Sequence, residues 1–494
     1  MSGTTGQQPD SDLPPEAWLR GLARVLRPYG YLGVDAQSGG IVPSSFRIEN
    51  TDLAASAAVD RADVVFYASV DGPQIANLDA QSEQGHQLLY WSGKKWFRRP
   101  PAFHALLPFV SFRPNQHLDP VIVTQSGDIV VGWLLRGNQR RLICGFDPVS
   151  QFARYTHGDP ARAGFSGQKN LWSAAGHEQP AYLYANHVVS GHEAAPWVDM
   201  LGSWLTETLS RMANIPALHP LPGGAKGAVL LTGDDDQAEL AKYRHQQKVL
   251  NGFPISYFMM DSTNHTPETI QELSPNTEFG LHVDSLERPG DYDKACAEQF
   301  TAVKVLLGDR DVRSIRNHGH LNRGYWGHIS AWDENGLKFD LNIRGLDGTC
   351  PTGSFLPFSV APDGTGWAER FSLFSTFSDS MKFYQELSER QQIRLIRRFV
   401  RQIEKVGPGV LVFNFHPQNV ADGEAVHRAI VAIGARKGWR PLGVTSYLRW
   451  LEGYWAARLI FDEGGFKLSG SVAVKELGLC HFSSGEIQMC DIHP

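Results

Sequence analysis

The sequence predicts an α/β protein with two larger domains and a small β addition at its C-terminal end. Short apolar runs bounded by Gly, Asp or Ser alternate with amphipathic segments, the pattern of parallel strands covered by helices. This alternation occurs twice, on either side of the Pro/Gly-rich segment 216–227, which is predicted to be a linker. At 494 residues the chain is also too long for one typical core.

The composition indicates a soluble protein without a polyanionic partner. The net charge is -6 and no Lys/Arg-rich run is present, so nucleic-acid binding is not expected. The first 19 residues are polar and are expected to be poorly ordered rather than a signal peptide, and no apolar run is long enough for a membrane span. The five cysteines are scattered, which argues against a disulfide framework. We therefore expect a cytoplasmic location, and the oligomeric state is not predicted.

Residues 20–215 are predicted to form the first α/β domain. Strands are expected in "GYLGVDA", "ADVVFYAS" and "HQLLYWSG", followed by two strands about Gly137 and Asn138 and a helix from Pro196 to Ala213. Through "GHQLLYWSG" and "RRLICGFDP" this segment resembles the class I glutamine-amidotransferase-like domain, which implies a flavodoxin-like parallel sheet. No cysteine lies in the Gly-bounded turn that carries the nucleophile in that family, so the resemblance implies a domain without glutaminase activity.

Residues 228–453 are predicted to form a second strand–helix series. Its strands are "AVLLT", "ISYFMM", "EFGLH", "VRSIRN", "KFDLN" and "VLVFNF", and repeated units of this size close most naturally into a (β/α) barrel. The expected helices are Gln237–Leu250, Thr266–Leu273, Tyr292–Leu307, Met381–Val406 and Gly423–Lys437. Residues 454–494 alternate around Gly pairs and are predicted to be β-hairpins.

Ionisable residues follow strand after strand of this second series. They gather where parallel sheets place functional groups, at the carboxyl ends of the strands. The set comprises Asp234, Asp235, Asp236, His282, Asp284, Arg316, His318, His320, Asp340 and His416. One aspartate would suffice to cap the helix that follows the first strand, whereas three adjacent carboxylates repel one another unless they share a cation. One Asp with two imidazoles is a common open zinc site.

These strand ends resemble the motifs of the polysaccharide deacetylase family, whose fold is a distorted (β/α) barrel. "TGDDD" corresponds to the family's Thr-Phe-Asp-Asp-Gly, "FGLHVDSLE" to a strand ending in His-x-x-x-His, "SIRNHGH" to Arg-x-Pro-Tyr and "VLVFNFHP" to the closing strand. The resemblance implies a divalent metal, zinc with cobalt, nickel or manganese as alternatives, bound by Asp235 and His282. It also implies Asp234 as general base, Arg316 as the residue that orients it, and His416 as general acid.

The sequence departs from this pattern at Leu286, which stands where the family has its second metal-binding histidine. His318 is the favoured replacement because it lies in the slot of another site motif. His320 is expected to face the same side as His318, since the two flank Gly319, and Glu287 is a further alternative. Asp236, at the position of the motif's Gly, is expected to cap the next helix, with metal binding as its alternative role.

The expected reaction is removal of an acyl group, acetyl first, from an N- or O-acylated sugar or polysaccharide. Tyr325 and Trp326 are candidate sugar-stacking residues or helix-packing residues, and Asp379 is either an N-cap, the favoured interpretation, or a site carboxylate. Two alternatives stay open. The same barrel hydrolyses small cyclic amides and formamides in relatives of this family, and a barrel that has lost its metal would be a binding or regulatory pseudoenzyme.

Overall fold

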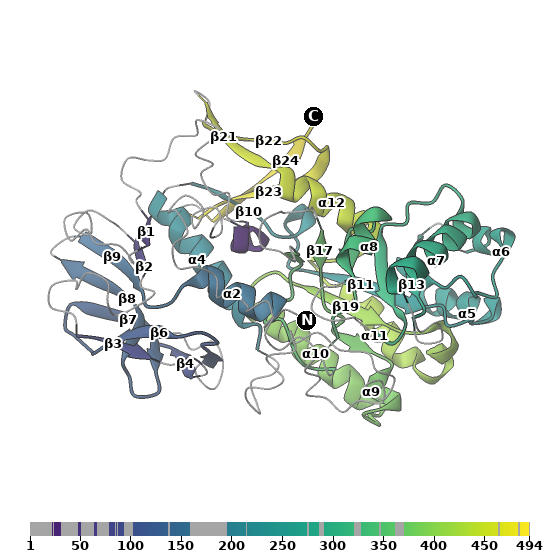
Figure 1. Cartoon of the computed structure of the whole chain (residues 1–494), viewed down its shortest axis with the longest axis horizontal. Helices are drawn as coiled ribbons and strands as arrows, with labels where there is room; N and C mark the ends of the chain where they lie inside the picture. The colour runs from purple at the N-terminus through teal and green to yellow at the C-terminus, as the bar shows by residue number, and fades with distance from the viewer. Residues whose placement is uncertain are drawn as a thin grey trace, which may run out of the picture.

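Three parts of the chain lie against one another in the computed structural model (Figure 1). A sheet of β-strands is on the left in that view, a larger α/β unit is on the right, and a pair of β-hairpins lies on top. The structure describes residues 22, 24–30, 48–50, 64–66, 79–83, 85, 87–92, 102–136, 139–158, 195–213, 215–273, 276–285, 291–320, 328–344, 347–360, 370–462, 465–482 and 485–493. Within these residues, no helix has the length and apolar character required to cross a membrane.

The first sheet is mixed and largely antiparallel. Among the residues that the structure describes, β1, β2 and β9 pair in parallel and β3 to β9 are joined by antiparallel ladders. Its strands are β1 (Ile48–Asn50), β2 (Val64–Phe66), β3 (Ala80–Glu83), β4 (Leu88–Trp91), β5 (Ala102–His104), β6 (Phe109–Phe112), β7 (Leu118–Thr124), β8 (Ile129–Arg136) and β9 (Gln139–Cys144). The flavodoxin-like parallel sheet expected from the amidotransferase resemblance is therefore wrong for this region.

Short connections explain why these strands run antiparallel. The chain passes from β7 to its neighbour β8 through residues 125–128 and from β8 to its neighbour β9 through residues 137–138. A parallel neighbour needs a crossover of about a dozen residues or more, which these links cannot supply. The predicted strand pair about Gly137 and Asn138 is confirmed, since β8 and β9 form an antiparallel ladder from Val131–Cys144 to Arg136–Gln139. The predicted helix at 196–213 is confirmed as α4 (Trp197–Ala213), whereas "GYLGVDA" after Gly30 lies outside the described residues.

The second unit is a curved parallel sheet with helices outside it. The order β16-β17-β15-β14-β13-β12-β11-β19-β18 is parallel except for the β16–β17 pair, and β20 also pairs with β11. The strands are β11 (Gly227–Asp234), β12 (Ile255–Met259), β13 (Thr277–Val283), β14 (Ser314–Asn317), β15 (Phe339–Asp340), β16 (Phe358–Ser359), β17 (Phe371–Ser372), β18 (Phe377–Ser378), β19 (Val410–Asn414) and β20 (Trp439–Leu442).

One segment, residues 371–378, links the two ends of this strand order. It pairs with β15 through β17 and with β19 through β18. Between them the Ser375 amide donates to Ile343 O and the Thr376 amide donates to Val412 O. The sheet therefore curls into a distorted barrel, as the sequence predicts, and the carboxyl ends of its strands meet at one rim.

Helices cover the outside of the barrel and connect it to its neighbours. The predicted helix Met381–Val406 is broken in two, because Glu386 has a left-handed φ of 51° and Ser388 forms a capping box with Gln391. The helices are α2 (Pro148–His157), α4, α5 (Leu240–Leu250), α6 (Pro267–Gln271), α7 (Tyr292–Leu307), α8 (Ile329–Glu334), α9 (Ser380–Phe383), α10 (Glu389–Val406), α11 (Glu424–Gly434) and α12 (Val444–Ala456), with 3-10 turns η1 (Arg27–Tyr29), η5 (Pro222–Gly224), η6 (His318–His320) and η7 (Pro417–Asp422).

The C-terminal hairpins agree with the prediction for residues 454–494. β21 (Arg458–Asp462) pairs antiparallel with β22 (Gly465–Ser469), and β23 (Val474–His481) pairs antiparallel with β24 (Glu486–Ile492). β23 also pairs with β10 (Ala217–Leu218), a short strand within the predicted linker. The C-terminal hairpins are thus joined by strand pairing to the segment that precedes the barrel.

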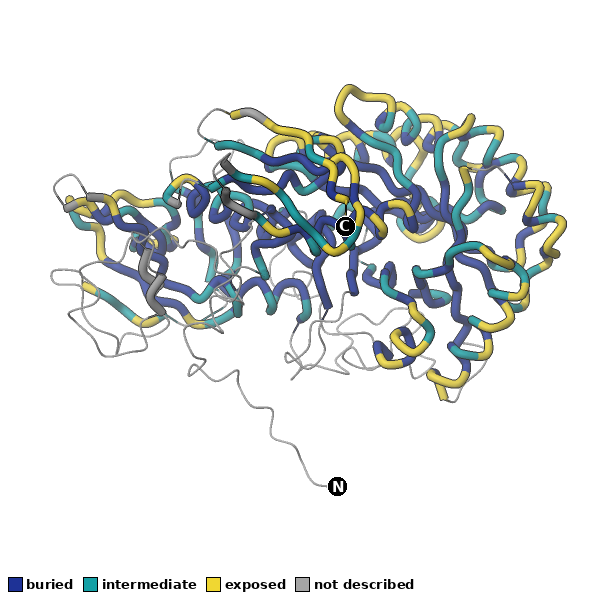
Figure 2. The backbone as a smooth tube through the Cα atoms, turned by 90° about the horizontal axis from the view of Figure 1, so that it is seen from above, coloured by how far each residue is buried: buried dark blue, intermediate teal, exposed yellow. Residues whose placement is uncertain are grey.

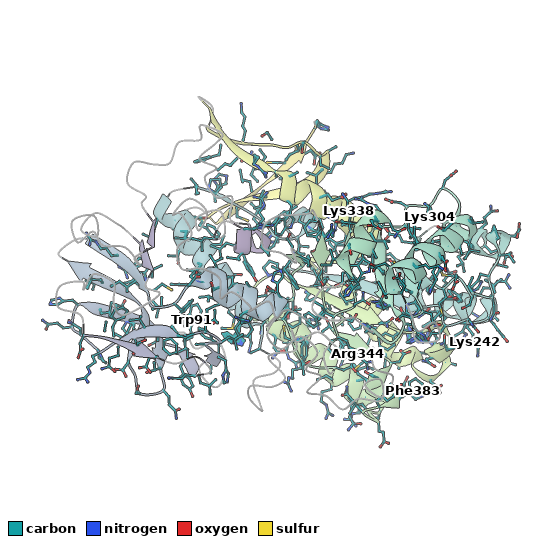
Figure 3. All side chains as sticks on the ribbon, in the orientation of Figure 1. Trp91, Lys242, Lys304, Lys338, Arg344 and Phe383 are labelled. Carbon is teal, nitrogen blue, oxygen red and sulfur yellow. The ribbon has the colours of Figure 1, made fainter. Side chains whose placement is uncertain are left out.

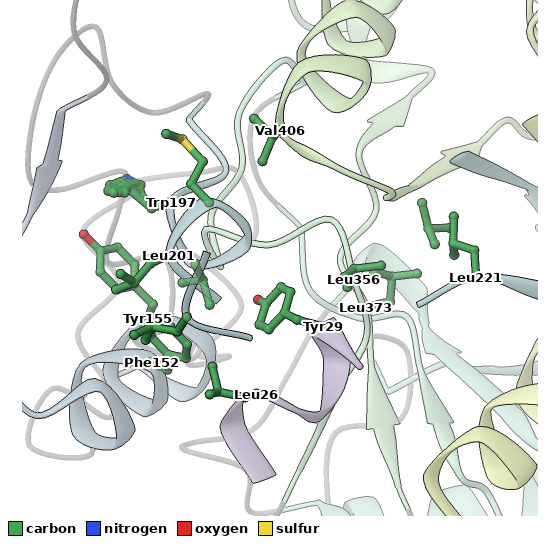
Figure 4. Packing of buried hydrophobic residues seen from close by; sticks show 14 of the residues in the cluster. Leu26, Tyr29, Phe152, Tyr155, Trp197, Leu201, Leu221, Leu356, Leu373 and Val406 are labelled. Atoms are coloured by element: carbon green, nitrogen blue, oxygen red, sulfur yellow. The ribbon is translucent and has the colours of Figure 1, made fainter. Parts of the chain in front are cut away.

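The three parts share one hydrophobic cluster. Its members include Tyr29 and Trp197 from the first part, Leu356 from the barrel and Leu479 from the hairpins, and Figure 4 shows several of these side chains meeting. Asp199 in α4 adds polar contacts, accepting hydrogen bonds from Ser354 Oγ (2.6 Å) and the Phe355 amide (2.7 Å). The barrel strands are buried and its helices expose their outer faces (Figure 2). The predicted domain boundaries stay predictions, but the parts pack as one body.

Candidate metal centre and catalytic residues

The rim of the barrel brings together most of the residues singled out in the sequence. Asp234 ends β11, His282 lies near the end of β13, and Arg316 lies in β14. Asp379 follows β18, and His416 comes two residues after β19. Because β11 lies between β12 and β19 and β13 adjoins β14, these side chains converge on one end of the barrel.

Asp234 is paired with Arg316 inside the barrel. Arg316 Nη1 is 2.8 Å from Asp234 Oδ1, and both side chains are almost completely buried. Burial alone would raise the pKa of Asp234, but the charges of Arg316, His282 and His416 overcome it and lower the pKa well below its usual range. Asp234 is therefore held in its carboxylate form.

Arg316 is itself held by several partners. Its Nη1 donates to Thr232 Oγ1 and Asn414 Oδ1, both at 2.9 Å, and its guanidinium lies 4.5 Å from the centre of the Phe258 ring. Asn414 Nδ2 donates to the second oxygen of Asp234 at 2.8 Å. Each oxygen of Asp234 thus has a donor, which fixes the carboxylate in one orientation.

Asp236 is the aspartate that faces the histidines. Its Oδ1 is 3.3 Å from His282 Nε2 and 3.9 Å from His318 Nε2, and its Oδ2 is 3.1 Å from His416 Nε2. Asp236 has a φ of 39°, so the chain turns just after β11 and directs this carboxylate into the rim. The expected capping role is wrong, because α5 begins after Glu239 and has no side-chain cap.

Asp235, the ligand expected from the family motif, has other partners. Its Oδ1 accepts a 2.5 Å hydrogen bond from Tyr243 and is 3.8 Å from His265 Nε2. Burial raises the pKa of this carboxyl, and the Tyr243 hydrogen bond opposes that rise. Asp236 rather than Asp235 therefore stands nearest to His282, so the alternative metal role of Asp236 becomes the better supported one.

His282 is oriented as metal-binding histidines usually are. Its Nδ1 is 2.8 Å from the carbonyl oxygen of Arg316, and because a carbonyl can only accept, Nδ1 carries the proton. In the neutral ring Nε2 then has a lone pair, and this lone pair faces Asp236 Oδ1. A backbone partner on the remote nitrogen is the arrangement that prepares an imidazole for a metal ion.

Several buried polar atoms at the rim have no hydrogen-bond partner among the described residues. His282 Nε2 and Asp236 Oδ1 are buried without a hydrogen-bond partner, and so are Asp235 Oδ2 and His265 Nε2. Buried acceptors that face one another are costly unless a proton or cation lies between them. Within the described part of the rim, no three His, Cys, Asp or Glu side chains are arranged around one point. Leu286 and Glu287 lie outside the described residues.

His318 and His320 have different neighbours at the rim, and His320 Nε2 lies 3.5 Å from Asn414 Nδ2. They lie in the turn η6, not in a strand, with Gly319 at a φ of 64°, so strand alternation does not apply. His318 contacts Asp284 Oδ1 at 3.3 Å, which raises its pKa, and its Nε2 is directed toward Asp236. His320 Nδ1 is 3.3 Å from Asn342 O, and burial lowers its pKa well below the ordinary value.

His416 is held by Asp379. The Asp379 Oδ2 atom accepts from His416 Nδ1 at 2.7 Å, from the His416 amide at 3.0 Å and from Asn419 Nδ2 at 2.6 Å. Burial alone would lower the pKa of His416, but hydrogen bonds to Asp236 and Asp379 raise it well above its ordinary value. The favoured capping role of Asp379 is wrong, since its side chain makes no cap hydrogen bond to α9.

Several residues of this site were not predicted. His265 precedes α6 on the loop after β12, Tyr243 lies in α5, and Asn414 ends β19. His265 and Asn414 do stand after or at strand ends, which was the available signal, whereas Tyr243 lies on a helix face and gave none. The predicted sugar-binding residues Tyr325 and Trp326 lie outside the described residues.

Comparisons with known proteins give structural likenesses only. No protein-family model and no curated protein sequence matches the chain. Among solved structures, a probable polysaccharide deacetylase from Pseudomonas aeruginosa PAO1 is similar to 50% of this chain and 96% of its own, at 14% identity and a TM-score of 0.37. The PuuE allantoinase is similar over 48% and 92%, at 14% identity and TM-score 0.35.

A family 4 carbohydrate esterase from Streptomyces lividans is similar to 44% of this chain and 92% of its own, at 14% identity and a TM-score of 0.29. All three TM-scores are below 0.5. The chemistry of the rim has to be argued from its own residues.

Proposed function

We propose that the chain is a metal-dependent hydrolase that removes an acetyl group from an N- or O-acetylated sugar or polysaccharide. One observation carries this proposal. At the barrel rim, an ionised carboxylate (Asp234), a protonated imidazole (His416) and a carboxylate–imidazole pair (Asp236 and His282) stand within contact distance of one another. In the last pair, the facing atoms Asp236 Oδ1 and His282 Nε2 have no hydrogen-bond partner in the part of the chain that the structure describes. Acyl hydrolysis needs a base, an acid and an electrophile in this proximity.

Asp236 and His282 would hold the metal, with His318, whose ring centre lies 5.5 Å from that of His282, as a further imidazole. Carboxylate oxygen and imidazole nitrogen suit zinc, and also cobalt, nickel and manganese. A divalent cation bound there would supply a Lewis acid that polarises the acyl carbonyl and acidifies a water molecule.

The protein residues then divide the proton transfers. Asp234, held by Arg316 and Asn414, takes the proton from the attacking water. His416, kept protonated by Asp379, donates a proton to the leaving sugar amine or hydroxyl. His416 Nε2 is 3.8 Å from Asp234 Oδ2. The proposed base at the end of β11 and the proposed acid after β19 therefore lie close together at the rim. Two groups with opposed pKa shifts can serve as base and acid at one pH.

The test is hydrolysis of acetylated oligosaccharides by the purified, metal-loaded chain. Acetate release should disappear on chelation and return with zinc or cobalt. His416→Ala should retain the metal and lose roughly 10²–10⁴-fold in turnover. Activity that survives complete metal removal would contradict the proposal, and activity toward cyclic amides but no acetyl sugar would redirect it.

A further inference from the structure

A row of exposed arginines runs along α10, away from the rim residues described above. Arg390, Arg394, Arg397 and Arg401 are spaced by four, three and four residues, which places them on one helix face. From Arg390 to Arg401 this arginine row covers twelve residues, or about 16 Å at the usual rise of a helix. The opposite face of α10 carries Ile396, Phe399, Val400 and Ile403, all buried against the barrel.

The charges of the arginine row are not balanced locally. No acidic residue occurs between Arg390 and Ile403, and the row has no ion pair among the described residues. Two exposed arginines elsewhere are paired. Arg244 pairs with Glu272, and Arg449 pairs with Asp311. Like charges at helical spacing destabilise a helix by roughly a few tenths of a kcal/mol per pair. The arginine row therefore lowers the stability of α10, in a chain whose net charge of -6 is of the opposite sign.

The arginine row borders a hollow rather than a flat surface. The hollow has a volume of about 570 Å³ and is lined by the four arginines, Ile393 and Ala425 of α11. Glu389 also borders it, but its carboxylate lies at one end and accepts a hydrogen bond from the Ala425 amide at 3.3 Å. Because the four arginines follow the axis of α10, a chain-like ligand lying along the helix would place its anionic groups against the guanidinium groups.

The arginine row continues from the rim along the chain. β18 leads through Asp379 to α9 and then to the first turn of α10. Phe383 and Tyr384 lie on this path and are 48% and 60% exposed. Figure 3 shows Phe383 and Arg344, which follows β15, on the same lower side of the barrel. Exposed aromatic rings offer apolar faces to sugars, so the path combines stacking surfaces with anion-binding groups.

We propose that the α10 hollow binds an acidic polysaccharide, and that the polymer whose acetyl groups are removed at the rim carries carboxylate groups. This partner is a polyanion, which the net charge of -6 argued against, and the local arginine row is the reason for the departure. The second part rests on the proposed function, while the first does not. Arginine favours carboxylates because its planar fork donates two parallel hydrogen bonds. A bilayer would need a flat or convex face, and a nucleic acid would need a larger basic surface than one helix supplies.

The test measures binding of polygalacturonate, with dextran as the neutral control, at physiological salt. Wild-type protein should bind polygalacturonate and not dextran. In R394Q/R397Q the Kd should rise by roughly tenfold or more, as expected when two charge-assisted hydrogen bonds are lost. R244Q/R449Q removes two exposed but paired arginines and should leave the Kd within about twofold.

Activity on a small neutral substrate separates the two proposals. R394Q/R397Q should hydrolyse acetylated chito-oligosaccharides as the wild type does while losing polymer binding. Suppose that the wild type deacetylates no substrate, and that polygalacturonate binding is still weakened in R394Q/R397Q. The proposed function would then be wrong, and the proposal that the α10 hollow binds an acidic polysaccharide would be retained. Equal polygalacturonate affinity in wild type and R394Q/R397Q, or tighter binding to phosphatidylglycerol vesicles or duplex DNA, would overturn the inference.

Discussion

Replacing Asp379 with asparagine tests how the general acid is maintained. Asp379 Oδ2 accepts hydrogen bonds from both Nδ1 and the amide of His416, and its charge helps to raise the pKa of His416. The D379N substitution keeps the shape of the side chain and removes its charge. A hydrogen bond to a charged group contributes about 1.5–3 kcal/mol, so losing its charged component should lower kcat by roughly 10–100-fold at neutral pH.

The pH profile distinguishes this effect from a general loss of structure. A general acid works only while protonated, so kcat should fall as the pH rises through the pKa of His416. With the carboxylate removed that pKa decreases, and the alkaline limb of the kcat profile should move to lower pH in D379N. The assay is acetate release from acetylated oligosaccharides between about pH 5 and 10.

Asp347 provides the matched control. It is a half-buried rim carboxylate that accepts a hydrogen bond from Gln385 Nε2 at 2.9 Å and has no contact with His416 among the described residues. D347N should leave the alkaline limb in place. If the limb is unchanged in D379N, or moves equally in both variants, Asp379 does not set the protonation of His416.

Two further predictions concern stability. Arg316→Met should lower the free energy of unfolding by about 3–5 kcal/mol, because it leaves the buried charge of Asp234 unpaired. Arg313→Met, at the partly exposed pair with Glu452, should lower it by no more than about 1 kcal/mol. Urea titrations measure both values, and equal losses would contradict the burial argument. Burial raises the pKa of Asp199 to about 7 in the folded protein. Between about pH 4 and 7, Asp199 is therefore protonated in the folded protein and ionised in the unfolded chain. The resulting stabilisation is complete below about pH 4 and disappears as the pH rises to 7. The D199N substitution should flatten this part of the plot of unfolding free energy against pH. A plot identical to that of the wild type would show that Asp199 does not titrate as described.

The sequence predicted the barrel better than the first sheet, for a physical reason. Barrel strands such as Ala228–Thr232 and Val410–Phe415 are buried on both faces, so they appear as continuous apolar runs separated by helices of regular length. In the first part the apolar runs are equally clear, but strand direction depends on the length of each connection. The four residues between Thr124 and Ile129 decide it.

The site was predicted to the level of strands and not of side-chain directions. Placing Asp234, Arg316 and His416 at one rim follows from parallel topology alone. Which aspartate faces His282 depends on the left-handed turn at Asp236, and an aspartate at that φ has no distinctive sequence pattern. The predicted capping role of Asp379 was wrong for a similar reason. A carboxylate just before a helix can either cap that helix or bind a histidine that is distant in the sequence, and the sequence does not distinguish the two.

Metal binding by three matched variants tests the central claim most directly. Purified wild type, D236N, H282A and D235N would be titrated with cobalt, following the visible absorption of the bound ion and the thermal midpoint. The account predicts one cobalt per wild-type chain with a raised midpoint, loss of both signals in D236N and H282A, and retention of the absorption band in D235N. No saturable cobalt binding by wild type, or binding lost in D235N and kept in D236N, would contradict it.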